Sequence, residues 1–375
     1  MKTNDQIPNI CIDVRYLTKN LSGIGRYIKH LTEKMLTVCN TKANFFLLGD
    51  TDNFDLLNLK KEDFIPIYTP YKATTHPLHD LWYNFRFPAI LKQHNINLFH
   101  ATAFMVPFVK LPCPLITTIC DRVAKAYPET IPFSFKTFLN INVAMAIRKS
   151  SQIIAISNFT KKEIEKEFKP SVPINVIHLG CSNKKLNPPS EKITHMSPYI
   201  LVVGNIEPRK GIEELLKGYL LYRTLHPEKR EKIIFAGQTL FNYTKPQKIR
   251  AQSIFKDSII FTSYIPENEL IDYYAGAKLN VIPSLYEGFG LTVLESMRAH
   301  SPILINDIEV LKEVGGSAVE KVDIRDSEQV EKKLFSLLEN QKDNKLMTDI
   351  YTKHLNNFTW EKCALNTFKA YEKNI

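Results

Sequence analysis

Short apolar runs and longer amphipathic segments alternate along the first half of the chain. Runs rich in Ile, Val, Leu and Phe predict strands, and segments with an apolar residue every three or four positions predict helices. Such alternation is typical of a parallel sheet with helices on its faces. The predicted strands are residues 10–14, 45–48, 98–100, 115–119, 153–156 and 176–178, and the predicted helices are residues 27–38 and 134–148.

A polar stretch at residues 182–198 interrupts this pattern with three prolines and no apolar periodicity, as expected of a linker between domains. The alternation then resumes, so the chain is predicted to be α/β throughout, with residues 1–185 as one domain and 186–357 as a second. A last helix, 358–375, places Trp360, Phe368 and Tyr371 on one face and should therefore pack on another part of the protein. The strands predicted for the second domain are residues 199–203, 232–236, 258–261, 279–282 and 303–305, and the helices are 211–223 and 291–299.

Composition supports an ordinary globular protein, because 44% of the 375 residues are hydrophobic and 23% are charged. No stretch approaches the roughly 20 apolar residues of a membrane span, and the first residues show no export signal. The six cysteines form no C-x-x-C pair and no zinc-ligand cluster. We therefore expect a cytoplasmic protein with free thiols.

The net charge of +10 lies in the first half of the chain. Residues 1–185 carry 24 Lys and Arg against 14 Asp and Glu, whereas residues 186–375 carry 25 of each kind. A basic domain joined to a neutral one suggests an anionic partner, such as a lipid surface, a phosphorylated acceptor or nucleic acid. The alternative is a solvated, lysine-rich surface without a partner.

Residues 279–295 (LNVIPSLYEGFGLTVLE) predict a buried strand, a glycine-containing loop and a helix. The amides of Phe289, Gly290 and Leu291 would lie at the helix N-terminus, where unpaired donors favour an anion such as a diphosphate. Glu287 and Glu295 could accept hydrogen bonds from hydroxyl groups of a sugar and a ribose. The alternative is an ordinary turn with two solvated glutamates.

Two further strand-to-helix turns carry candidate ligand-binding residues. In residues 203–211 (VGNIEPRKG), Arg209 and Lys210 could neutralise a leaving diphosphate, unless this is simply an exposed charged turn. In residues 21–27 (LSGIGRY), Gly23 and Gly25 would let a ligand approach the backbone. This second turn lacks the third glycine of a dinucleotide fingerprint, so a dehydrogenase is poorly supported.

These segments, in this order, resemble the retaining glycosyltransferases of family 4 (group 1), which have the GT-B fold and include bacterial mannosyltransferases of surface-polysaccharide assembly. The resemblance covers nearly the whole chain. The segments that carry it are residues 12–16, 22–27, 98–101, 116–121, 127–129, 154–158, 203–210, 261–265 and 287–295.

The resemblance implies two Rossmann-like domains facing across a cleft, with the nucleotide sugar held mainly by the second and the acceptor by the first. It also implies that the C-terminal helix, residues 358–375, packs back on the first domain. It implies no metal and no cofactor apart from the nucleotide sugar, because cationic side chains and backbone amides stabilise the diphosphate. Arg209, Lys210 and Glu287 would be catalytic, together with Asp121 and Cys120. The other implied residues are Glu295 at the ribose, Tyr264 and Ile265 at the base, Gly204, Gly23, Gly25, Phe289, Gly290 and Leu291 along the donor, and Arg26 and Ser157 on the acceptor side.

Two positions depart from the family pattern. Family members commonly have a histidine that contacts the donor sugar where this chain has Cys120. Because a thiol is a weak hydrogen-bonding group, that contact must be weaker, supplied by another residue, or suited to a sugar that lacks a hydroxyl. Thr292 stands where a proline is usual, which removes a rigid residue from the helix start but no chemical group.

The resemblance therefore implies an enzyme that moves a hexose, with mannose from GDP-mannose as the expected donor, onto a glycan or lipid-linked acceptor for a cell-surface polysaccharide such as lipopolysaccharide. The basic first domain would lie on the cytoplasmic face of an anionic membrane. Cys120 leaves open a catalytically silent homologue that binds a nucleotide sugar or a partner enzyme. Nucleic-acid binding is disfavoured, because no known module of interleaved basic and aromatic residues is present.

Overall fold

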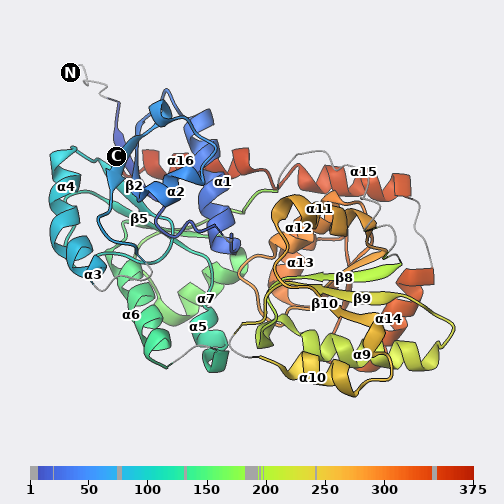
Figure 1. The fold of residues 1–375 in the computed structure, drawn as a ribbon. Coiled ribbons are helices and arrows are strands. Elements are labelled where there is room, and N and C mark those ends of the chain that lie inside the picture. Colours follow the sequence, from blue (N-terminus) through green and yellow to red (C-terminus); the bar gives the residue numbers. More distant parts are fainter. Residues whose placement is uncertain are drawn as a thin grey trace. The chain divides into compact units, whose positions relative to one another are not determined.

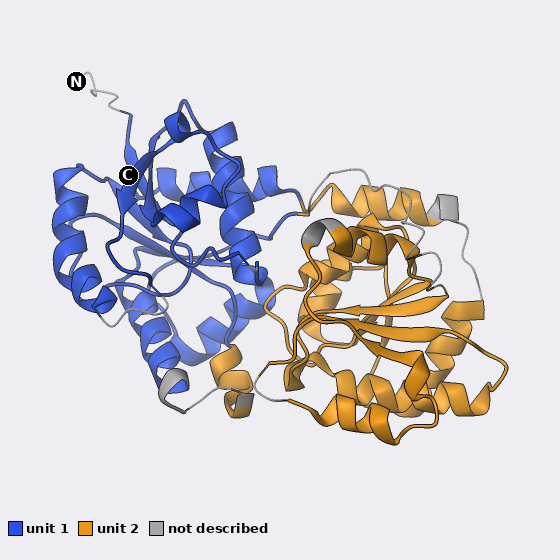
Figure 2. Ribbon diagram, viewed as in Figure 1, with its two compact units in different colours: residues 1–122, 133–180, 359–375 blue, residues 123–132, 181–358 orange. Residues whose placement is uncertain are grey.

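The computed structural model describes residues 7–19, 21–73, 78–130, 133–181, 193, 196, 198–240, 243–339 and 344–375. The chain divides into two compact units (Figures 1 and 2). Unit 1 comprises residues 1–122, 133–180 and 359–375, and unit 2 comprises residues 123–132 and 181–358. The predicted domains end within a few residues of these boundaries, but residues 123–132, which were assigned to the first domain, belong to unit 2. Most of the predicted linker lies outside the described residues.

Unit 1 contains a parallel sheet of seven strands in the order β3-β2-β1-β4-β5-β6-β7. Strands β1, β4, β5 and β6 are buried almost throughout, as expected when helices cover both faces of a parallel sheet. The strands are β1 (Asn9–Asp13), β2 (Asn44–Gly49), β3 (Ile65–Tyr68), β4 (Leu98–Ala101), β5 (Leu115–Ile119), β6 (Gln152–Ala155) and β7 (Ile174–Val176).

The helices of unit 1 surround this sheet (Figure 1). Helix α1 begins at Gly23, where the Ser22 side chain accepts a hydrogen bond from the amide of Gly25 and so caps the helix. The helices and helical turns are α1 (Gly23–Val38), α2 (Thr51–Asp55), η1 (Lys61–Asp63), α3 (His79–Leu81), η2 (Trp82–Arg86), α4 (Phe87–Gln93), α6 (Phe133–Lys149), α7 (Asn158–Phe168) and α16 (Trp360–Glu372).

The C-terminal helix α16 packs against α1 within unit 1. The rings of Trp360 and His30 lie 5.0 Å apart, and the hydroxyl of Tyr371 lies 2.6 Å from Nδ1 of His100 on β4. A Cβ atom on Gly180 would lie 2.1 Å from the backbone nitrogen of Trp360. The segment that leaves unit 1 and the segment that returns to it are therefore in close backbone contact. The C-terminal helix α16 is therefore part of the core of unit 1, together with α1 and β4.

Unit 2 contains a parallel sheet of six strands in the order β10-β9-β8-β11-β12-β13. Alternate residues of β8 face opposite sides, with Ile200 and Val202 packed toward α9 and α14, and Tyr199 and Leu201 packed toward α11. The strands are β8 (Tyr199–Val203), β9 (Lys232–Ala236), β10 (Ile259–Phe261), β11 (Leu279–Ile282), β12 (Ile303–Asn306) and β13 (Glu320–Val322).

The helices of unit 2 lie on both sides of this sheet, with α9, α10 and α14 on one side and α11 and α12 on the other (Figure 1). Among the described residues, no helix has the length and apolar character needed to span a membrane. The helices and helical turns are α5 (Val123–Ala126), η3 (Pro128–Thr130), η4 (Pro208–Lys210), α9 (Ile212–Leu225), α10 (Lys245–Gln252), η5 (Lys256–Ser258), α11 (Glu267–Gly276), α12 (Leu291–Arg298), α13 (Glu309–Gly315), α14 (Ser327–Glu339) and α15 (Asn344–Leu355).

One strand prediction is displaced. The sequence suggested a strand at residues 176–178, whereas β7 runs from Ile174 to Val176. The carbonyl of Pro173 accepts a hydrogen bond from the amide of Ile153, so pairing with β6 begins directly after the proline. Proline has no amide hydrogen to donate, but its carbonyl oxygen can still accept a hydrogen bond. The strand can therefore begin directly after Pro173, two residues earlier than the sequence suggested.

Candidate active site

The candidate donor site lies where the connections of the unit 2 sheet diverge. Strands β8 and β11 are neighbours, and from them the chain continues outward to β9 and β10 on one side and to β12 and β13 on the other. In open parallel sheets, ligands bind outside the carboxyl ends of the strands at such a switch point. The loops after β8 and β11 hold Arg209, Lys210 and Glu287, which the sequence predicted as catalytic.

Backbone contacts hold these two loops together. The carbonyl of Arg209 accepts hydrogen bonds from the amides of Leu285, at 2.8 Å, and Tyr286, at 3.4 Å. Gly211 has a φ of +63°, and a Cβ atom at this position would lie 2.1 Å from the carbonyl oxygen of Pro283. Only glycine combines this left-handed backbone with so close an approach.

Glu287 lies between two cations. Its carboxylate accepts hydrogen bonds from Nζ of Lys210, from Nη1 of Arg209 at 3.2 Å and from the Ser284 hydroxyl at 2.8 Å. The Glu287 side chain is only 12% exposed. Burial alone would raise its pKa, but the charges of Lys210 and Arg209, with the hydrogen bonds from Lys210 and Ser284, lower the pKa to about 2. Glu287 is therefore ionised at any pH at which an enzyme of this kind works.

A second carboxylate completes the cluster. Glu207 is buried, and its Oε1 lies 2.8 Å from Nη2 of Arg209. Arg209 and Lys210 thus face Glu207 and Glu287, so that their formal charges balance. Glu207 and Ser284 were not predicted as site residues, although Glu207 lies in residues 203–211 and Ser284 in residues 279–295. The feature of the sequence that could have indicated Glu207 is its position two residues before the predicted catalytic residue Arg209.

The helix that follows Glu287 starts as predicted, at Leu291. Gly290 precedes it with a φ of +102°, and a Cβ atom there would lie 2.8 Å from Leu311. Phe289 is buried, with its ring centroid 6.1 Å from that of Phe358, so its side chain anchors the loop in the core. Glu295 accepts a hydrogen bond from the Tyr274 hydroxyl of α11 at 2.7 Å. Tyr274 therefore orients the carboxylate predicted to hold the ribose, a role that the sequence did not reveal.

The remaining predicted donor residues of unit 2 lie after β8 and β10. Gly204 has a φ of +141°, and a Cβ atom at this position would lie 3.5 Å from the Lys210 side chain. Tyr264 is exposed, and Ile265 packs against the core on the α11 side. All three follow the carboxyl ends of strands, at the edge of the sheet that holds Glu287. No contact joins Tyr264 or Ile265 directly to Glu287 among the hydrogen bonds of the described residues.

The predicted residues of unit 1 are spread over three segments. Gly23 is exposed with open space around it, Gly25 is buried with its amide bound to the Ser22 cap, and Arg26 follows in the first turns of α1. Ser157 is fully buried and caps α7 through the amide of Thr160, at 3.0 Å. Ser157 thus stabilises the start of α7, and none of its atoms is exposed to an acceptor.

Cys120 and Asp121 directly follow strand β5. Cys120 is buried, and burial, together with the charge of Asp121, raises the pKa of its thiol well above the usual value. The group is therefore a neutral thiol at physiological pH and neither a nucleophile nor a proton-transfer group. In the described part of the chain, no three His, Cys, Asp or Glu side chains come together where they could hold a metal ion.

Two compact units, each with a parallel sheet covered by helices, are the architecture of glycosyltransferases with the GT-B fold. A family model for glycosyl transferases group 1 matches residues 183–353, and one for glycosyltransferase family 4 matches residues 22–183. The chain belongs to the glycosyltransferases that combine these two domains. The family and the GT-B fold predicted from the sequence motifs are thereby confirmed.

Individual proteins support the same conclusion. The O-antigen chain mannosyltransferase B of Escherichia coli is 26% identical over 376 residues, which covers 94% of this chain and 96% of the relative. Sucrose-phosphate synthase from Thermosynechococcus elongatus has a similar structure, with a TM-score of 0.74, 15% identity and 98% of each chain covered. HepE from Anabaena in complex with UDP-glucose matches with a TM-score of 0.69 and 16% identity, covering 97% of this chain and 99% of HepE. These two structures share the fold of this chain.

Proposed function

We propose that this glycosyltransferase moves a hexose from a nucleotide sugar to a hydroxyl group of a glycan or lipid-linked acceptor, with retention of the anomeric configuration. The observation that carries the proposal is the cluster of Arg209, Lys210 and Glu287 at the switch point of the unit 2 sheet. It combines cations for a diphosphate with an ionised carboxylate for sugar hydroxyls. Mannose from GDP-mannose is the proposed donor, since the full-length relative is named as an O-antigen mannosyltransferase.

Binding of the donor would rearrange this cluster. Without ligand, the carboxylate of Glu287 takes up donors of both Lys210 and Arg209. Diphosphate oxygens would compete for these donors, and the carboxylate released from them would accept hydrogen bonds from the sugar. The backbone contact between the two loops would keep these side chains near one another, so that only their hydrogen-bond partners change.

The proposed reaction breaks the bond between the anomeric carbon and the phosphate oxygen and forms one between that carbon and the acceptor oxygen on the same face. The acceptor proton passes to the departing phosphate oxygen. Arg209 and Lys210 stabilise the negative charge that develops on the diphosphate, as a metal ion does in other transferases. We propose that the enzyme works without a metal, and activity that persists in excess EDTA would support this.

The main test uses purified protein and a panel of GDP-, UDP- and dTDP-sugars. The nucleotide sugar that most strongly protects the protein against thermal unfolding identifies the donor, and its transfer or slow hydrolysis is then measured. Glu287→Ala and Lys210→Ala should each lower the rate by about 10²–10³-fold, the usual loss for one group that stabilises transition-state charge. Lys217→Ala, an exposed position on α9, is the matched control and should retain the wild-type rate. Full activity in both site variants would refute the assignment.

Two further measurements refine this proposal. The anomeric configuration of the first product, read by proton NMR before it equilibrates, distinguishes retention from inversion.

A catalytically silent homologue is the second candidate, because Cys120 stands at the position of a sugar-contacting histidine. Such a protein would be protected by a nucleotide sugar but would neither transfer nor hydrolyse it.

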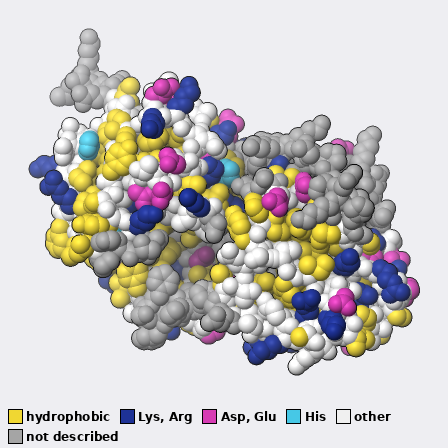
Figure 3. Space-filling view, in the orientation of Figure 1, with side chains coloured by type: hydrophobic (Ala, Val, Ile, Leu, Met, Phe, Trp, Pro, Cys, Tyr) yellow, Lys and Arg dark blue, Asp and Glu magenta, His cyan; other side chains and the backbone are white. Residues whose placement is uncertain are grey.

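We also propose that the protein acts in the cytoplasm and lies peripherally on an anionic membrane through unit 1. Leu81 and Phe85 of α3 and η2 are exposed, and Figure 3 shows hydrophobic side chains next to Lys and Arg on this part of unit 1. Exposed apolar side chains flanked by cations suit an anionic bilayer. Vesicles with anionic lipid should retain the protein at low salt, and Phe85→Ser, which leaves the charge unchanged, should weaken retention. Equal behaviour with neutral vesicles would contradict the proposal.

A further inference from the structure

Glu207 is a buried carboxylate beside the donor site, and the proposed reaction leaves it without a role. It directly precedes the short turn η4, which holds Arg209 and Lys210, and its side chain is 6% exposed. Its Oε1 lies 2.8 Å from Nη2 of Arg209. A carboxylate is costly to bury unless a cation pairs with it, so the position of Glu207 depends on this ion pair.

The backbone on both sides of Glu207 is fixed by hydrogen bonds to other loops. Ile206 is buried and pairs with residues 238–240, through main-chain hydrogen bonds of 2.8 and 3.1 Å. The carbonyl of Arg209 accepts a hydrogen bond from the amide of Leu285. The main chain at Glu207 is therefore anchored to the loop after β9 on one side and to the loop after β11 on the other. Such support holds a side chain in one orientation.

The guanidinium of Arg209 has different partners at its two terminal nitrogens. Nη2 pairs with Glu207, whereas Nη1 donates to Oε2 of Glu287 and to the carbonyl oxygen of Tyr286, both at 3.2 Å. The side chain of Glu287 is 12% exposed, twice the value for Glu207. In the proposed function, a diphosphate competes with Glu287 for Nη1, while Nη2 keeps its bond to the more deeply buried Glu207. A planar guanidinium held at one nitrogen can change partners at the other without changing its place.

Glu207 also changes the charge that a diphosphate meets. Arg209 and Lys210 carry two formal positive charges, and Glu207 and Glu287 carry two negative ones. The charge of Glu207 attracts the guanidinium, but it repels an anion bound beside that guanidinium. Tighter binding of the diphosphate in substrate, transition state and product alike would not accelerate transfer. The orientation of Arg209 therefore favours the reaction, whereas the charge of Glu207 weakens the affinity for diphosphate.

We propose that Glu207 is a positioning residue that fixes the guanidinium of Arg209 for charge stabilisation and whose own charge allows the nucleoside diphosphate product to leave. The proposal rests on the proposed glycosyl transfer and adds a residue that acts through Arg209 without touching the substrate. It has a characteristic consequence: loss of Glu207 slows the reaction and tightens diphosphate binding. A residue that only stabilised unit 2 would weaken both.

The test measures two quantities in Glu207→Ala and Glu207→Gln. These are the single-turnover rate, with the donor identified by thermal protection, and the Kd of GDP, UDP and dTDP by calorimetry. Glu207→Ala removes the carboxylate that holds Nη2, so the rate should fall about 10²-fold, the loss expected for a misplaced group. Glu207→Gln restores an acceptor oxygen and should recover about tenfold of this loss. Both variants should bind the nucleoside diphosphate of the donor about tenfold more tightly, because one negative charge is gone.

Glu231→Gln is the matched control. Glu231 is 5% exposed, as Glu207 is, and its Oε1 lies 3.0 Å from Nζ of Lys278. It precedes β9 and so lies at the opposite end of the parallel strands from the donor site. Glu231→Gln should lower the thermal stability and leave the rate and the Kd values unchanged. An unchanged rate in Glu207→Ala, or slower transfer together with weaker diphosphate binding in both Glu207 variants, overturns the proposal.

Failure of the proposed function has a different appearance, because it is seen in the wild type alone. If the wild type neither transfers nor hydrolyses any nucleotide sugar, glycosyl transfer is refuted, and the charge effect of Glu207 is decided by binding. Tighter binding of GDP, UDP or dTDP in Glu207→Gln than in the wild type supports it. Equal or weaker binding, or a wild type that binds none of the three, overturns it.

Discussion

The carbonyl oxygen of Arg209 accepts a hydrogen bond from the backbone amide of Leu285 at 2.8 Å. Because this contact joins main-chain atoms, it fixes the loop after β8 against the loop after β11 whatever the rotamers of their side chains. Arg209 and Lys210 then meet Glu287 across it. The ion-pair cluster therefore depends on backbone geometry, and in particular on Gly211, which permits the two loops to approach each other closely.

Gly211→Ala should separate the two loops. The substitution forces a left-handed alanine, which costs about 1–2 kcal/mol, and brings a Cβ atom against the carbonyl of Pro283. We expect faster hydrogen exchange in peptides that contain β8 and β11 and a loss of kcat/KM of at least tenfold. Lys217→Ala, at an exposed position on α9, is the control and should leave both measurements unchanged. Equal effects of the two substitutions would refute the role of backbone approach.

Most strands, in their succession along the chain, and the loops that carry the site could be predicted from the sequence, since both depend on local patterns. Buried runs such as residues 199–203 and 279–282 predict their strands directly. Strands β3 and β13 were missed, because they are short and partly exposed at the edges of their sheets. An edge strand with few buried residues gives little periodic signal.

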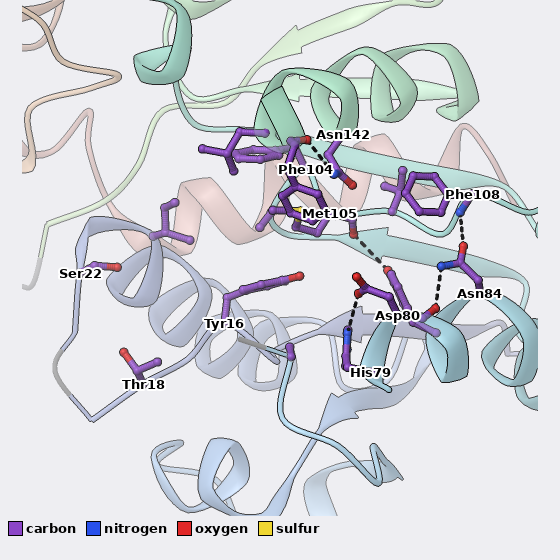
Figure 4. A pocket seen from close by; sticks show the side chains of 17 residues that line it. Tyr16, Thr18, Ser22, His79, Asp80, Asn84, Phe104, Met105, Phe108 and Asn142 are labelled. Atoms are coloured by element: carbon purple, nitrogen blue, oxygen red, sulfur yellow. Dashed lines mark hydrogen bonds and ion pairs between the residues drawn. The ribbon is translucent and has the colours of Figure 1, made fainter. Parts of the chain in front are cut away.

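The members of the site could be predicted, but their mutual contacts could not. Arg209 and Glu287 are 78 residues apart, and their pairing depends on the conformation at Gly211. The hydrogen bond from Tyr274 to Glu295 likewise requires two helices to pack, which no local pattern encodes. The cavity in unit 1 outside the carboxyl ends of β1 and β4 (Figure 4) could not be predicted for the same reason, since its walls come from four separate segments.

Glu287 should stabilise unit 2 in a defined range of acid pH. Its pKa is about 2 in the folded protein against an ordinary 4.5, so its stabilising contribution is complete above pH 4.5 and is lost as the pH falls toward 2. The wild-type free energy of unfolding should fall by up to about 3 kcal/mol across this range from this group alone. Glu287→Gln should lack that part of the slope, measured by urea unfolding and hydrogen exchange of unit 2 peptides. The exposed Glu228→Gln is the control, and a slope that persists in Glu287→Gln contradicts the prediction.

His100 should make unit 1 sensitive to milder acid. The side chain is fully buried, and burial lowers its pKa from 6.5 to about 3. Protons bind the unfolded chain first, so stability is complete above pH 6.5 and falls by up to about 5 kcal/mol as the pH approaches 3. Tryptophan fluorescence reports this unit alone, because both tryptophans, Trp82 and Trp360, belong to it. His100→Gln should flatten the decline between pH 6.5 and 3.

The variant Tyr371→Phe distinguishes the effect of protonating His100 from the effect of losing its hydrogen bond with Tyr371. This variant leaves Nδ1 of His100 without the Tyr371 hydroxyl and should lower stability at pH 7 by about 1–3 kcal/mol, the usual cost of an unsatisfied buried group. The decline between pH 6.5 and 3 should remain, because the imidazole is still present. If Tyr371→Phe flattened this decline as His100→Gln does, burial of the imidazole would not be its cause.

Cys120 should resist alkylation in the folded protein. Burial and Asp121 raise its pKa, so almost no thiolate forms at pH 8, and the side chain is only 5% exposed. Cys113 is partly exposed with a pKa raised to about 11, and it should react with iodoacetamide before Cys120. Peptide mass spectrometry after timed labelling, with and without urea, measures both rates. Labelling of native Cys120 as fast as in urea would show that the thiol is accessible.

Replacement of the same thiol determines what it contributes to transfer. A neutral, buried thiol offers only a weak hydrogen bond, so Cys120→Ala should lower kcat/KM for the donor by less than about tenfold, the equivalent of 1.4 kcal/mol. Cys120→Ser is the matched variant, because it restores a polar group of similar size. A loss of more than 10²-fold in Cys120→Ala, recovered in Cys120→Ser, would instead mean that this position contacts the donor sugar directly. A small loss in both variants means that other residues stabilise the sugar, and Glu287, already ionised between two cations, is the first to examine.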